Sequence, residues 1–292
     1  MIISNIIGGL GNQMFQYATA RAVSIDLGAK LVLDTSDFVG YRLHQGFELK
    51  RVFECQADIA TDADTDFLLR WRKAKLARRL LRKLPLPLLC SKHVVFEPTL
   101  QYWPGIKDVL DDSYLMGYWQ SEKYFAHHAQ TIRKDFSFKT EFSTKNAEIA
   151  SHICGTNAVS LHIRRGDYVS HARTKSTLGV CSIEYYQAAI TQISEQVSTP
   201  EFFIFSDDMA WVKGNFQLDF PSHYIDHNNG EDSFNDMRLM SLCQHHIIAN
   251  SSFSWWGAWL NPSLEKFVFA PQNWFANGTD TSDLIPANWI RL

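Results

Sequence analysis

Apolar runs of strand length alternate with amphipathic helical patterns at both ends of this chain, and this alternation strongly limits the folds it can adopt. At the N-terminal end, residues 2–7 predict a buried strand, residues 13–27 a helix, and residues 31–33 a second strand. Asn12 stands where a helix cap is expected, and Gly28 where the helix ends. A strand, a helix and a second strand in this order form a βαβ unit with parallel strands.

The same alternation returns after Gly155. Residues 158–163 and 202–205 are apolar enough for buried strands, and a helical pattern lies between them. The length of 292 residues is enough for two domains. We therefore predict an α/β chain of two Rossmann-like domains with parallel sheets, over residues 1–155 and 156–292.

Composition excludes several classes of protein. The net charge of −3 does not fit a nucleic-acid binder, which needs a basic surface. The five cysteines are scattered, odd in number and free of C-x-x-C pairs, so we expect reduced intracellular thiols rather than a disulfide framework or a zinc site. The sequence has no run of 18 apolar residues and no signal-peptide pattern at its start. These features together predict a cytoplasmic protein with no nucleic-acid partner.

Residues 158–168, AVSLHIRRGDY, place two adjacent arginines at the end of a predicted strand. The planar guanidinium groups of Arg164 and Arg165 match phosphate oxygens two at a time. The glycine that follows allows a sharp turn and the close approach of a ligand. Asp167 is placed to brace one guanidinium so that the other stays aimed. A surface turn with a local Arg–Asp pair is the alternative interpretation.

Two further predicted strands also end in polar residues. Asp207 and Asp208 follow residues 202–205 and suit guanine N–H groups, ribose hydroxyls, a metal ion or a helix cap. Residues 250–254, Asn-Ser-Ser-Phe-Ser, lead from a strand into a helix. The helix start can bind an anion, or its serines can simply cap the helix. In open α/β sheets ligands bind beyond the carboxyl ends of the strands, so we expect these clusters to converge on a diphosphate site.

The N-terminal glycine turn imitates a dinucleotide fingerprint. Gly9 and Gly11 have its spacing and Asp34 ends the next strand, but the third glycine position holds Met14. We therefore do not predict a dehydrogenase that binds NAD. The turn still places Asn12 and Gln13 at a helix start, where they can hold sugar hydroxyls.

Residues 67–84 form a predicted basic amphipathic helix. Such a helix suits peripheral contact with an anionic membrane surface, or it packs its apolar stripe on its own domain. Asp62-Ala-Asp64 resembles a metal-binding motif but does not follow a clear strand. His127-His128 and His245-His246 lack metal spacing, because adjacent residues face apart on a helix or strand. No metal site is expected.

Four blocks of this sequence resemble the inverting α-1,2-fucosyltransferases of bacteria and animals. They appear in the family's order: GGLGNQMFQYA at 8–18, HIRRGDY at 162–168, FSDD at 205–208 and LMSLCQHHIIANSSFSWWGAWLNP at 239–262. The resemblance implies a GT-B-like fold of two facing Rossmann-like domains, with the C-terminal domain binding GDP-L-fucose and the N-terminal one helping to hold the acceptor. It also implies that neither a metal ion nor a cofactor is needed.

The resemblance assigns roles to individual residues. Arg164 and Arg165 would contact the pyrophosphate, and Asp167 would orient them. Ser206 to Asp208 would reach the guanosine, and Ser251 to Ser254 would close on the β-phosphate. Apart from the resemblance, His162 lies on the same face of the predicted strand as Arg164, where it would touch base or phosphate, or is a packed histidine. The candidate donor-site residues are His162, Arg164, Arg165, Ser206, Asp207, Asp208, Asn250, Ser251, Ser252, Phe253 and Ser254, and the acceptor-side candidates are Gly9, Gly11, Asn12 and Gln13.

The predicted activity is that of a galactoside 2-α-L-fucosyltransferase, acting in bacterial surface-glycan (O-antigen) synthesis on an acceptor that a lipid can carry. Arg164 and Asp167 are the candidate catalytic residues. A general base is needed, and the spacing does not single out one of Asp34, Asp37, His44 and Glu48. The alternatives are a fucosyltransferase of another linkage and a non-catalytic nucleotide-sugar binder.

Overall fold

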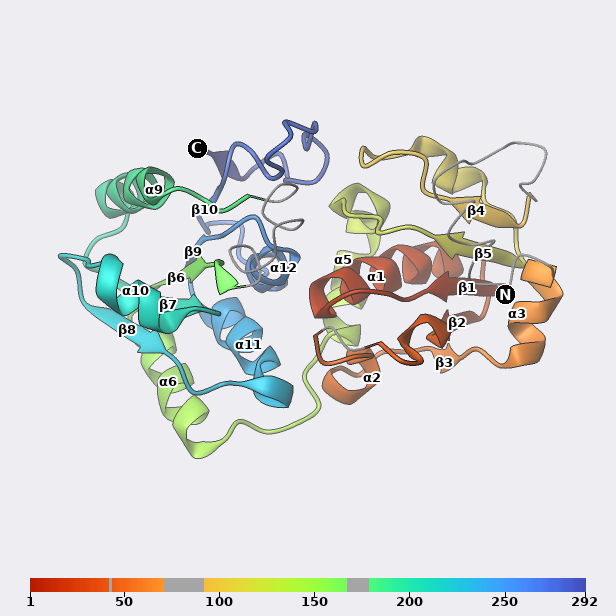
Figure 1. Cartoon of the computed structure of the whole chain (residues 1–292), viewed down its shortest axis with the longest axis horizontal. Coiled ribbons are helices and arrows are strands. Elements are labelled where there is room, and N and C mark those ends of the chain that lie inside the picture. Colours follow the sequence, from red (N-terminus) through yellow and green to blue (C-terminus); the bar gives the residue numbers. More distant parts are fainter. Residues whose placement is uncertain (42–43, 71–91, 167–178) are drawn as a thin grey trace. The chain divides into compact units, whose positions relative to one another are not determined.

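The computed structural model describes residues 1–41, 44–70, 92–166 and 179–292. The chain divides into two compact units (Figure 1). Unit 1 comprises residues 1–139 and 282–286, and unit 2 comprises residues 140–281 and 287–292. The units meet at 139/140 rather than at the predicted 155/156, because helix α6 (Thr144–Cys154) packs against unit 2 elements.

Unit 1 contains a five-stranded sheet in the order β3-β2-β1-β5-β4, and all its paired strands are parallel. The βαβ unit predicted at the N-terminus is present as β1, α1 and β2. Helix α1 begins at Leu10 with Gly9 as its cap, so Asn12 lies inside the first turn and is not the cap as predicted. The elements are β1 (Ile2–Asn5), α1 (Leu10–Asp26), β2 (Leu31–Asp34), α2 (Leu49–Val52), β3 (Asp58–Ile59), α3 (Asp62–Leu69), β4 (Val94–Phe96), β5 (Ser113–Met116) and α5 (Ala129–Asp135).

Helix α3 begins five residues before the predicted basic helix of residues 67–84. Thr61 caps it through a capping box with Asp64, whose carboxylate accepts from the Thr61 N–H at 2.8 Å. Asp64 therefore serves the helix start rather than a metal. Residues 71–84 lie outside the described part of the chain, and with them most of the helix predicted to touch a membrane.

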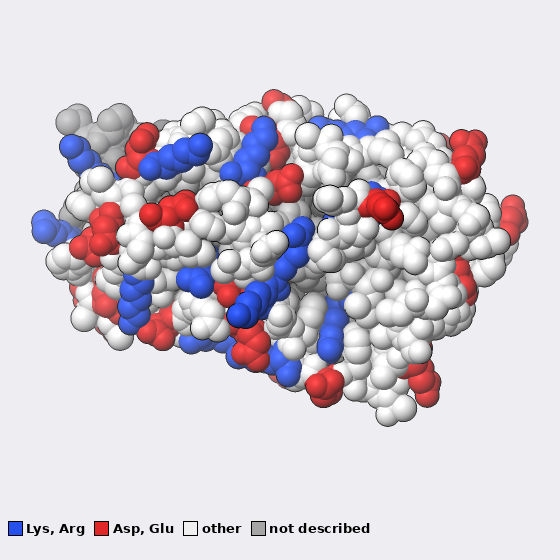
Figure 2. All heavy atoms as spheres, turned by 180° about the vertical axis from the view of Figure 1, so that it is seen from behind, with Lys and Arg blue, Asp and Glu red and all other residues white. Residues whose placement is uncertain are grey.

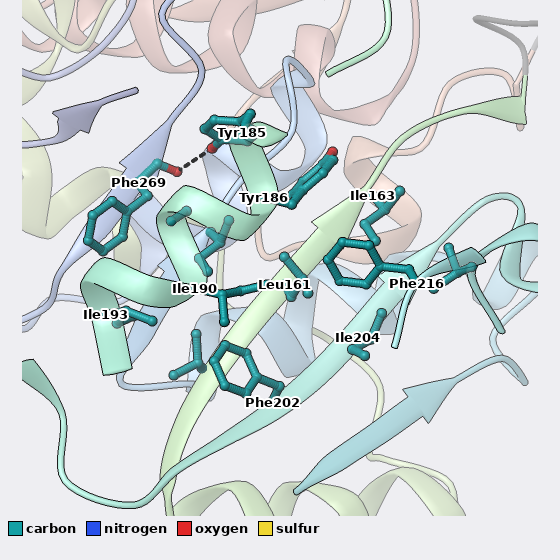
Figure 3. Packing of buried hydrophobic residues seen from close by; sticks show 14 of the residues in the cluster. Leu161, Ile163, Tyr185, Tyr186, Ile190, Ile193, Phe202, Ile204, Phe216 and Phe269 are labelled. Carbon is teal, nitrogen blue, oxygen red and sulfur yellow. Dashed lines mark hydrogen bonds between the residues drawn. The ribbon is translucent and has the colours of Figure 1, made fainter. Parts of the chain in front are cut away.

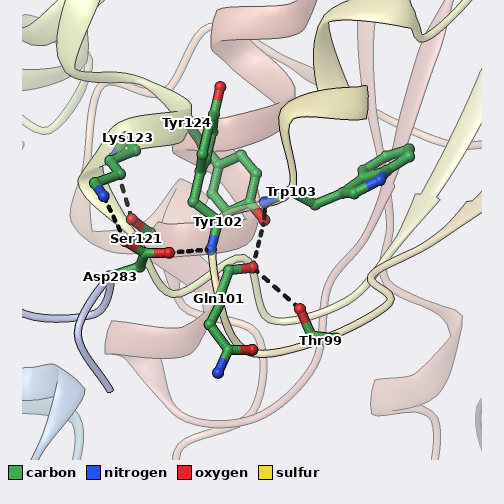
Figure 4. Close-up of polar contacts among 8 residues, drawn as sticks. All are labelled: Thr99, Gln101, Tyr102, Trp103, Ser121, Lys123, Tyr124 and Asp283. Carbon is green, nitrogen blue, oxygen red and sulfur yellow. Dashed lines mark hydrogen bonds and ion pairs between the residues drawn. The ribbon is translucent and has the colours of Figure 1, made fainter. Parts of the chain in front are cut away.

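The chain closes unit 1 with a segment from near its C-terminal end (Figure 4). Asp283 accepts a hydrogen bond from the Tyr102 N–H at 2.9 Å and pairs with the Lys123 ammonium group. The Trp103 N–H donates to the hydroxyl of Tyr124 at 2.9 Å, and the Tyr102 and Tyr124 rings lie 4.9 Å apart. Residues 282–286 thus belong to unit 1, although the sequence placed all residues after 155 in the second domain.

Unit 2 contains a six-stranded sheet in the order β11-β10-β9-β6-β7-β8, again with parallel pairing. Read from β8, the sequence order of the strands is 3-2-1-4-5-6, which is the Rossmann order. The order in which strands are added to the sheet therefore reverses between β6 and β9, which run parallel to each other. The elements are β6 (Asn157–Ile163), α9 (Ile183–Gln196), β7 (Pro200–Ser206), α10 (Met209–Asn215), β8 (Ser222–Ile225), α11 (Phe234–Leu242), β9 (His245–Ile247), α12 (Ser252–Leu260), β10 (Val268–Ala270) and β11 (Ile290–Arg291).

Helices cover both faces of the unit 2 sheet, because alternate residues of β6 point to opposite sides. Leu161 and Ile163 pack with Tyr186 and Ile190 of α9 on one face (Figure 3), whereas Ala158 packs with residues of α6 and α11 on the other. The hydroxyl of Tyr185, also on α9, donates to the Phe269 carbonyl of β10 at 3.0 Å. Both faces of β6 are buried, as in parallel strands that helices cover on both sides, and the polar side chains of Ser160 and His162 are buried as well.

Candidate active site

The arginine pair lies at the carboxyl edge of the unit 2 sheet, at the point where the strand order reverses. Arg164 and Arg165 follow β6, and residues 250–254 follow β9, its neighbour on one side. On the other side, Ile163 pairs with Ser206 at the last step of the β6–β7 ladder. The three clusters expected to converge therefore follow three adjacent strands, at the position where Rossmann folds bind their ligands.

Asp207 braces both arginines from the neighbouring strand. One of its carboxylate oxygens lies 3.0 Å from Nε of Arg164, and the other accepts from the backbone N–H of Arg165 at 2.9 Å. A Cβ atom at Gly166 would lie 2.8 Å from the same carboxylate, so this contact explains the glycine. Asp207 thus performs the orienting role expected of Asp167. Asp167 itself lies outside the described residues.

The guanidinium of Arg165 stacks on the Trp211 ring, 3.6 Å from the ring centroid. Its Nε lies 4.0 Å from the Asp208 carboxylate and is buried without a hydrogen-bond partner. Because the ring covers one face and the carboxylate stands at one edge, the guanidinium is held in place. Both arginine side chains remain 23% exposed, which leaves part of each group open to a ligand.

Asp208 and Ser206 shape the turn into α10. Asp208 is the N-cap of α10 and accepts from the Trp211 N–H at 3.2 Å, and its own N–H donates to Ser206 Oγ at 3.0 Å. Of the roles considered for Asp208, the structure contains the helix cap. That cap positions Trp211 beneath Arg165.

His162 lies inside the sheet layer rather than on the surface of the site. Its side chain is buried, its ring lies 6.1 Å from that of Phe253, and its Nδ1 has no hydrogen-bond partner. Burial, reinforced by the Arg164 charge, lowers the pKa of His162 to about 3. The imidazole is therefore neutral at physiological pH, and its role is that of a packed polar group behind Arg164.

In the segment that leads from β9 into α12, some side chains are buried and hydrogen-bonded, whereas others are accessible to a ligand. The Asn250 amide is buried, donates to the carbonyls of Gly179 and Trp274, and accepts from the thiol of Cys181. Ser251 caps α12 by accepting from the Phe253 N–H at 3.3 Å. The Ser254 side chain is buried and bonds to the Ser251 carbonyl. Ser252 and Phe253 are half-buried, so they are the members of this group most open to a ligand.

A pocket of about 250 Å³ opens beside Arg165. Its other walls are Ile163, Tyr186, Trp211 and Phe216, together with residues 180–183. Apolar walls next to a cation are typical of pockets for organic anions. Burial raises the pKa of Cys181, one of the lining residues, to about 11, so its thiol stays protonated.

In unit 1, two of the predicted acceptor-side residues, Gln13 and Asn12, differ in how far their side chains are buried. Gln13 is fully buried: its amide donates to the carbonyls of Gly8 and Gly46 and accepts from the Glu48 N–H. It therefore holds the loop and has no exposed atom for a sugar hydroxyl. Asn12 is half-buried and accepts from Gln120 at 2.8 Å, which joins the first turn of α1 to the segment after β5.

Steric contacts explain why glycine occupies positions 8 and 9 of this turn. Gly8 has a φ of +82°, and a Cβ there would lie 2.9 Å from the Asn12 amide nitrogen. A Cβ at Gly9 would lie 3.4 Å from the His44 ring, so the imidazole rests directly over the turn. Gly11 is buried inside α1. The turn is thus built for close packing of Asn12 and His44.

Two of the four candidate general bases have structural roles. Asp34 is buried and accepts from the Tyr114 hydroxyl and the Ser36 N–H. Glu48 is buried and paired with Arg51 at 2.9 Å, and burial raises its pKa. Asp37 is half-buried and accepts from Asn5 at 3.1 Å, next to the carboxyl end of β1. Asp37 and His44 stay predictions for the base.

Glu97 is an acid that the sequence interpretation missed. It directly follows β4, and its two oxygens accept from the backbone N–H groups of Tyr118 and Trp119 at 2.6 and 2.8 Å. A Cβ at Gly117 would lie 2.4 Å from the Glu97 Cβ, so only glycine fits there. Burial raises the pKa of Glu97 to about 7 even though two N–H groups favour its anion. An acid immediately after an apolar run was the available signal.

We expect Glu97 to make the stability of unit 1 depend on pH. Its ordinary pKa is 4.5, so between about pH 4.5 and about pH 7 the folded protein holds a proton that the unfolded chain has released. The free energy of unfolding should therefore fall as pH rises through this window and level off above it. Thermal unfolding from about pH 5 to about pH 8 measures this. Glu97→Gln, which cannot titrate, should make the profile less steep, with the remaining slope due to Asp236, whose pKa burial also raises to about 7; an unchanged slope would contradict the assignment.

The side chains of His127 and His128, which were expected to face apart, both contact Asp26. The Nε2 atoms of His127 and His128 lie 3.0 and 2.7 Å from the two carboxylate oxygens of Asp26. The expectation that adjacent histidines face apart is wrong for this pair. They lie in a short 3-10 turn, residues 126–128, that precedes helix α5, and this turn allows both side chains to reach Asp26. A second group, His152, Glu201 and His223, joins one helix and two strands.

The face of the molecule shown in Figure 2 carries charges of both signs, consistent with the small net charge of −3. On the face in Figure 2, blue Lys and Arg side chains are interspersed with red Asp and Glu. None of the described helices combines the length and apolar character needed to span a bilayer.

Comparisons with known proteins agree with this geometry. The sequence profile of glycosyl transferase family 11 matches residues 110–292. An alpha-1,2-colitosyltransferase of Escherichia coli is 35% identical over all of this chain and 99% of its own length. The O-antigen biosynthesis glycosyltransferase WbnK of the same species is 32% identical over 99% of both chains. Galactoside alpha-(1,2)-fucosyltransferase 2 of the gorilla is 25% identical over 88% of this chain and 68% of its own length.

Solved structures identify the fold. The NodZ alpha-1,6-fucosyltransferase soaked with GDP-fucose aligns with a TM-score of 0.52 at 16% identity, covering 89% of this chain and 92% of the other. Arabidopsis thaliana FUT1 aligns with a TM-score of 0.53 at 11% identity, covering 93% and 70%. The predicted fold class is confirmed as a GT-B-like α/β fold of two Rossmann-like units with parallel sheets.

Proposed function

The chain belongs to glycosyl transferase family 11, and from this membership we propose that it transfers L-fucose from GDP-L-fucose to a β-galactoside. The acceptor atom is the 2-hydroxyl oxygen of the terminal galactose, and the anomeric carbon is inverted. The wider role is the assembly of a bacterial O-antigen, as the name of the WbnK relative suggests. The acceptor is then an oligosaccharide that a lipid can carry.

The observation that carries this proposal is the braced arginine pair. Arg164 and Arg165 share Asp207 as a partner and lie beside the start of α12, at the strand reversal of unit 2. Two fixed cations next to a helix N-terminus stabilise charge that develops on phosphate oxygens. The pocket of about 250 Å³ beside Arg165 suits the nucleoside part of the donor.

The reaction balances without a redox partner. The bond between fucose C1 and the β-phosphate oxygen breaks, and its electron pair leaves with GDP. The acceptor oxygen forms a new bond to C1 from the opposite face, and its proton passes to a base. Because the arginines supply fixed positive charge at the leaving group, no metal ion is required for this step.

Glu97 is our preferred candidate for the base in unit 1, ahead of Asp37 and His44. Its pKa of about 7 suits proton transfer near neutral pH, and its position is fixed by two backbone N–H groups. If it acts as the base, the rate of transfer rises with pH through about 7 and Glu97→Gln removes that rise. If it only orders the turn, the variant lowers stability and leaves the shape of the pH–rate profile unchanged.

The donor sugar separates two closely related activities. Relatives named for colitosyl and for fucosyl transfer both align with most of this chain. We favour fucose because the four sequence blocks resemble fucosyltransferases. A colitosyl transferase is the second candidate, supported by the 35% identity over the whole chain.

The test measures GDP release by the purified chain in EDTA. The donor is GDP-L-fucose or GDP-linked colitose, each with and without lactose. We expect release from GDP-L-fucose that depends on lactose and persists in EDTA, with a product whose linkage NMR identifies. Preference for the colitose donor would replace the fucosyl proposal. Loss of activity in EDTA would refute metal independence. Tight binding of both donors without turnover on any galactoside would favour a non-catalytic binder.

A further inference from the structure

We propose that unit 2 carries a Zn²⁺ site formed by His152, Glu201 and His223, at the edge of the sheet opposite the arginine pair. Glu201 is the second residue of β7 and His223 the second of β8, whereas Arg164 and Asp207 follow the carboxyl ends of their strands. His152 is near the end of α6. The site is therefore separate from the transfer chemistry and does not rest on the proposed function.

The three side chains converge on one point. The Nε2 atoms of both histidines contact the same carboxylate oxygen, Oε1 of Glu201, at 2.9 Å for His152 and as a short contact for His223. The three ligand atoms lie within 4.8 Å of one another. Each Nε2 can donate a hydrogen bond to this oxygen, which satisfies the contacts when no metal is bound. When both nitrogens are deprotonated, the same arrangement offers two imidazole lone pairs and a carboxylate oxygen to a single cation.

A core phenylalanine fixes the two rings in this orientation. His223 stacks on Phe203 with centroids 4.8 Å apart and an interplanar angle of 21°, and His152 meets the same ring edge-on at 5.6 Å. The two imidazole centroids lie 4.5 Å apart. Phe203 is only 1% exposed, so the rings rest on a rigid part of the core. Such preorganisation reduces the ordering that metal binding must impose.

The donor set favours zinc among the common cations. Two imidazoles and one carboxylate form a known three-ligand zinc set, which keeps a fourth position for water. Ca²⁺ and Mg²⁺ prefer sites made of oxygen ligands alone, whereas two of the three ligands here are imidazole nitrogens. The exposures of the side chains, 44% for His152, 36% for His223 and 16% for Glu201, leave a path for the ion and room for water.

The second histidine group is a weaker candidate. His127 and His128 bind different oxygens of Asp26, so their nitrogens do not converge on one atom. The Asp26 carboxylate is 51% exposed, compared with 16% for that of Glu201. This group is therefore suited to be the matched control.

The proposed ion would connect α6 to the starts of β7 and β8. A ligand that binds only the folded state stabilises it. We therefore expect Zn²⁺ to raise the melting temperature of the metal-free protein and to slow proteolysis of the α6 segment.

The experiment uses Co²⁺, whose visible absorption reports tetrahedral coordination, followed by displacement with Zn²⁺. The full chain is stripped with chelator, freed of it and titrated. The variants are His152→Gln and Glu201→Gln, with His127→Ala as control. The wild type and the control should bind one equivalent with the tetrahedral band. Both site variants should bind more than about tenfold more weakly, because losing even an outer-shell partner costs that much.

Three outcomes would overturn the proposal. They are an unchanged cobalt band in both site variants, loss of the band in His127→Ala, and no binding by the wild type in millimolar excess of metal. Far-UV circular dichroism of every variant shows whether it is folded. Because Glu201→Gln has nearly the shape of the native side chain, it separates loss of the ligand from loss of packing.

Discussion

Replacing Arg164 with alanine is expected to lower kcat for sugar transfer by about 10²–10³-fold, the typical cost of removing one fixed donor from a developing oxyanion. The side chain is held by Asp207 at 3.0 Å, so it needs little reorganisation when the β-phosphate acquires charge. Because charge builds up mainly in the transition state, the loss should appear in kcat more than in KM. Arg164→Lys keeps the charge but not the fork, and should retain part of the rate.

The control is Lys213→Ala, which removes one positive charge from α10 in the same unit. Lys213 pairs with Asp226 at 2.7 Å on the surface, with 49% and 42% exposed side chains. It should leave kcat close to that of the wild type. Initial rates of GDP release measure all three variants. If Arg164→Ala turned over within about tenfold of the wild type while folded, the arginine would not be the leaving-group contact.

Replacing Asp135 with alanine is expected to lower the free energy of unfolding by about 3–5 kcal/mol, the usual cost of leaving a buried ion pair without one partner. The carboxylate is 5% exposed and accepts from the Tyr17 hydroxyl at 2.7 Å and from Arg21 Nε at 2.9 Å. The same hydroxyl accepts from the Gln56 N–H at 2.8 Å. The network thereby fixes α1, α5 and the segment after α2.

Urea unfolding measures the loss, and hydrogen exchange shows whether it is confined to peptides of unit 1. Tyr17→Phe keeps the ring and should cost less, about 1–3 kcal/mol for one unsatisfied buried partner. Asp58→Ala breaks a surface pair with Lys30, in which both side chains are more than 60% exposed, and should change little. A loss in Asp135→Ala no larger than in Asp58→Ala would contradict a stabilising network.

The arginine site was predictable because its parts lie at strand ends. The apolar run of residues 158–163 and the polar residues after it predicted where β6 ends, and the same pattern predicted the end of β7. Parallel strands place such ends at one edge of a sheet, so the convergence of these clusters followed from the pattern. The resemblance of four sequence blocks to the α-1,2-fucosyltransferases then predicted which sugar nucleotide is the donor.

The partners within the site were not predictable in the same way. Asp207 was expected to contact nucleotide or metal or to cap a helix. The structure adds that it braces Arg164, because the register that pairs Ile163 with Ser206 places the next residues side by side. Asn250 was expected at the donor, but its buried amide bonds to Gly179 and Trp274. Gln13 likewise donates to the carbonyls of Gly8 and Gly46 rather than facing a sugar. Each outcome depends on residues far away in the sequence.

The sequence by itself determined the periodic strands and helices, the two Rossmann-like units and the family. These properties depend on neighbouring residues: period, capping and the length of apolar runs act within one element. Only the tertiary structure decided that Asp283 completes unit 1, that Glu97 holds the Tyr118 turn, and that His152 and His223 meet at one carboxylate. Strand order and register bring these residues together, and they are set by the packing of the whole unit, which no local pattern encodes.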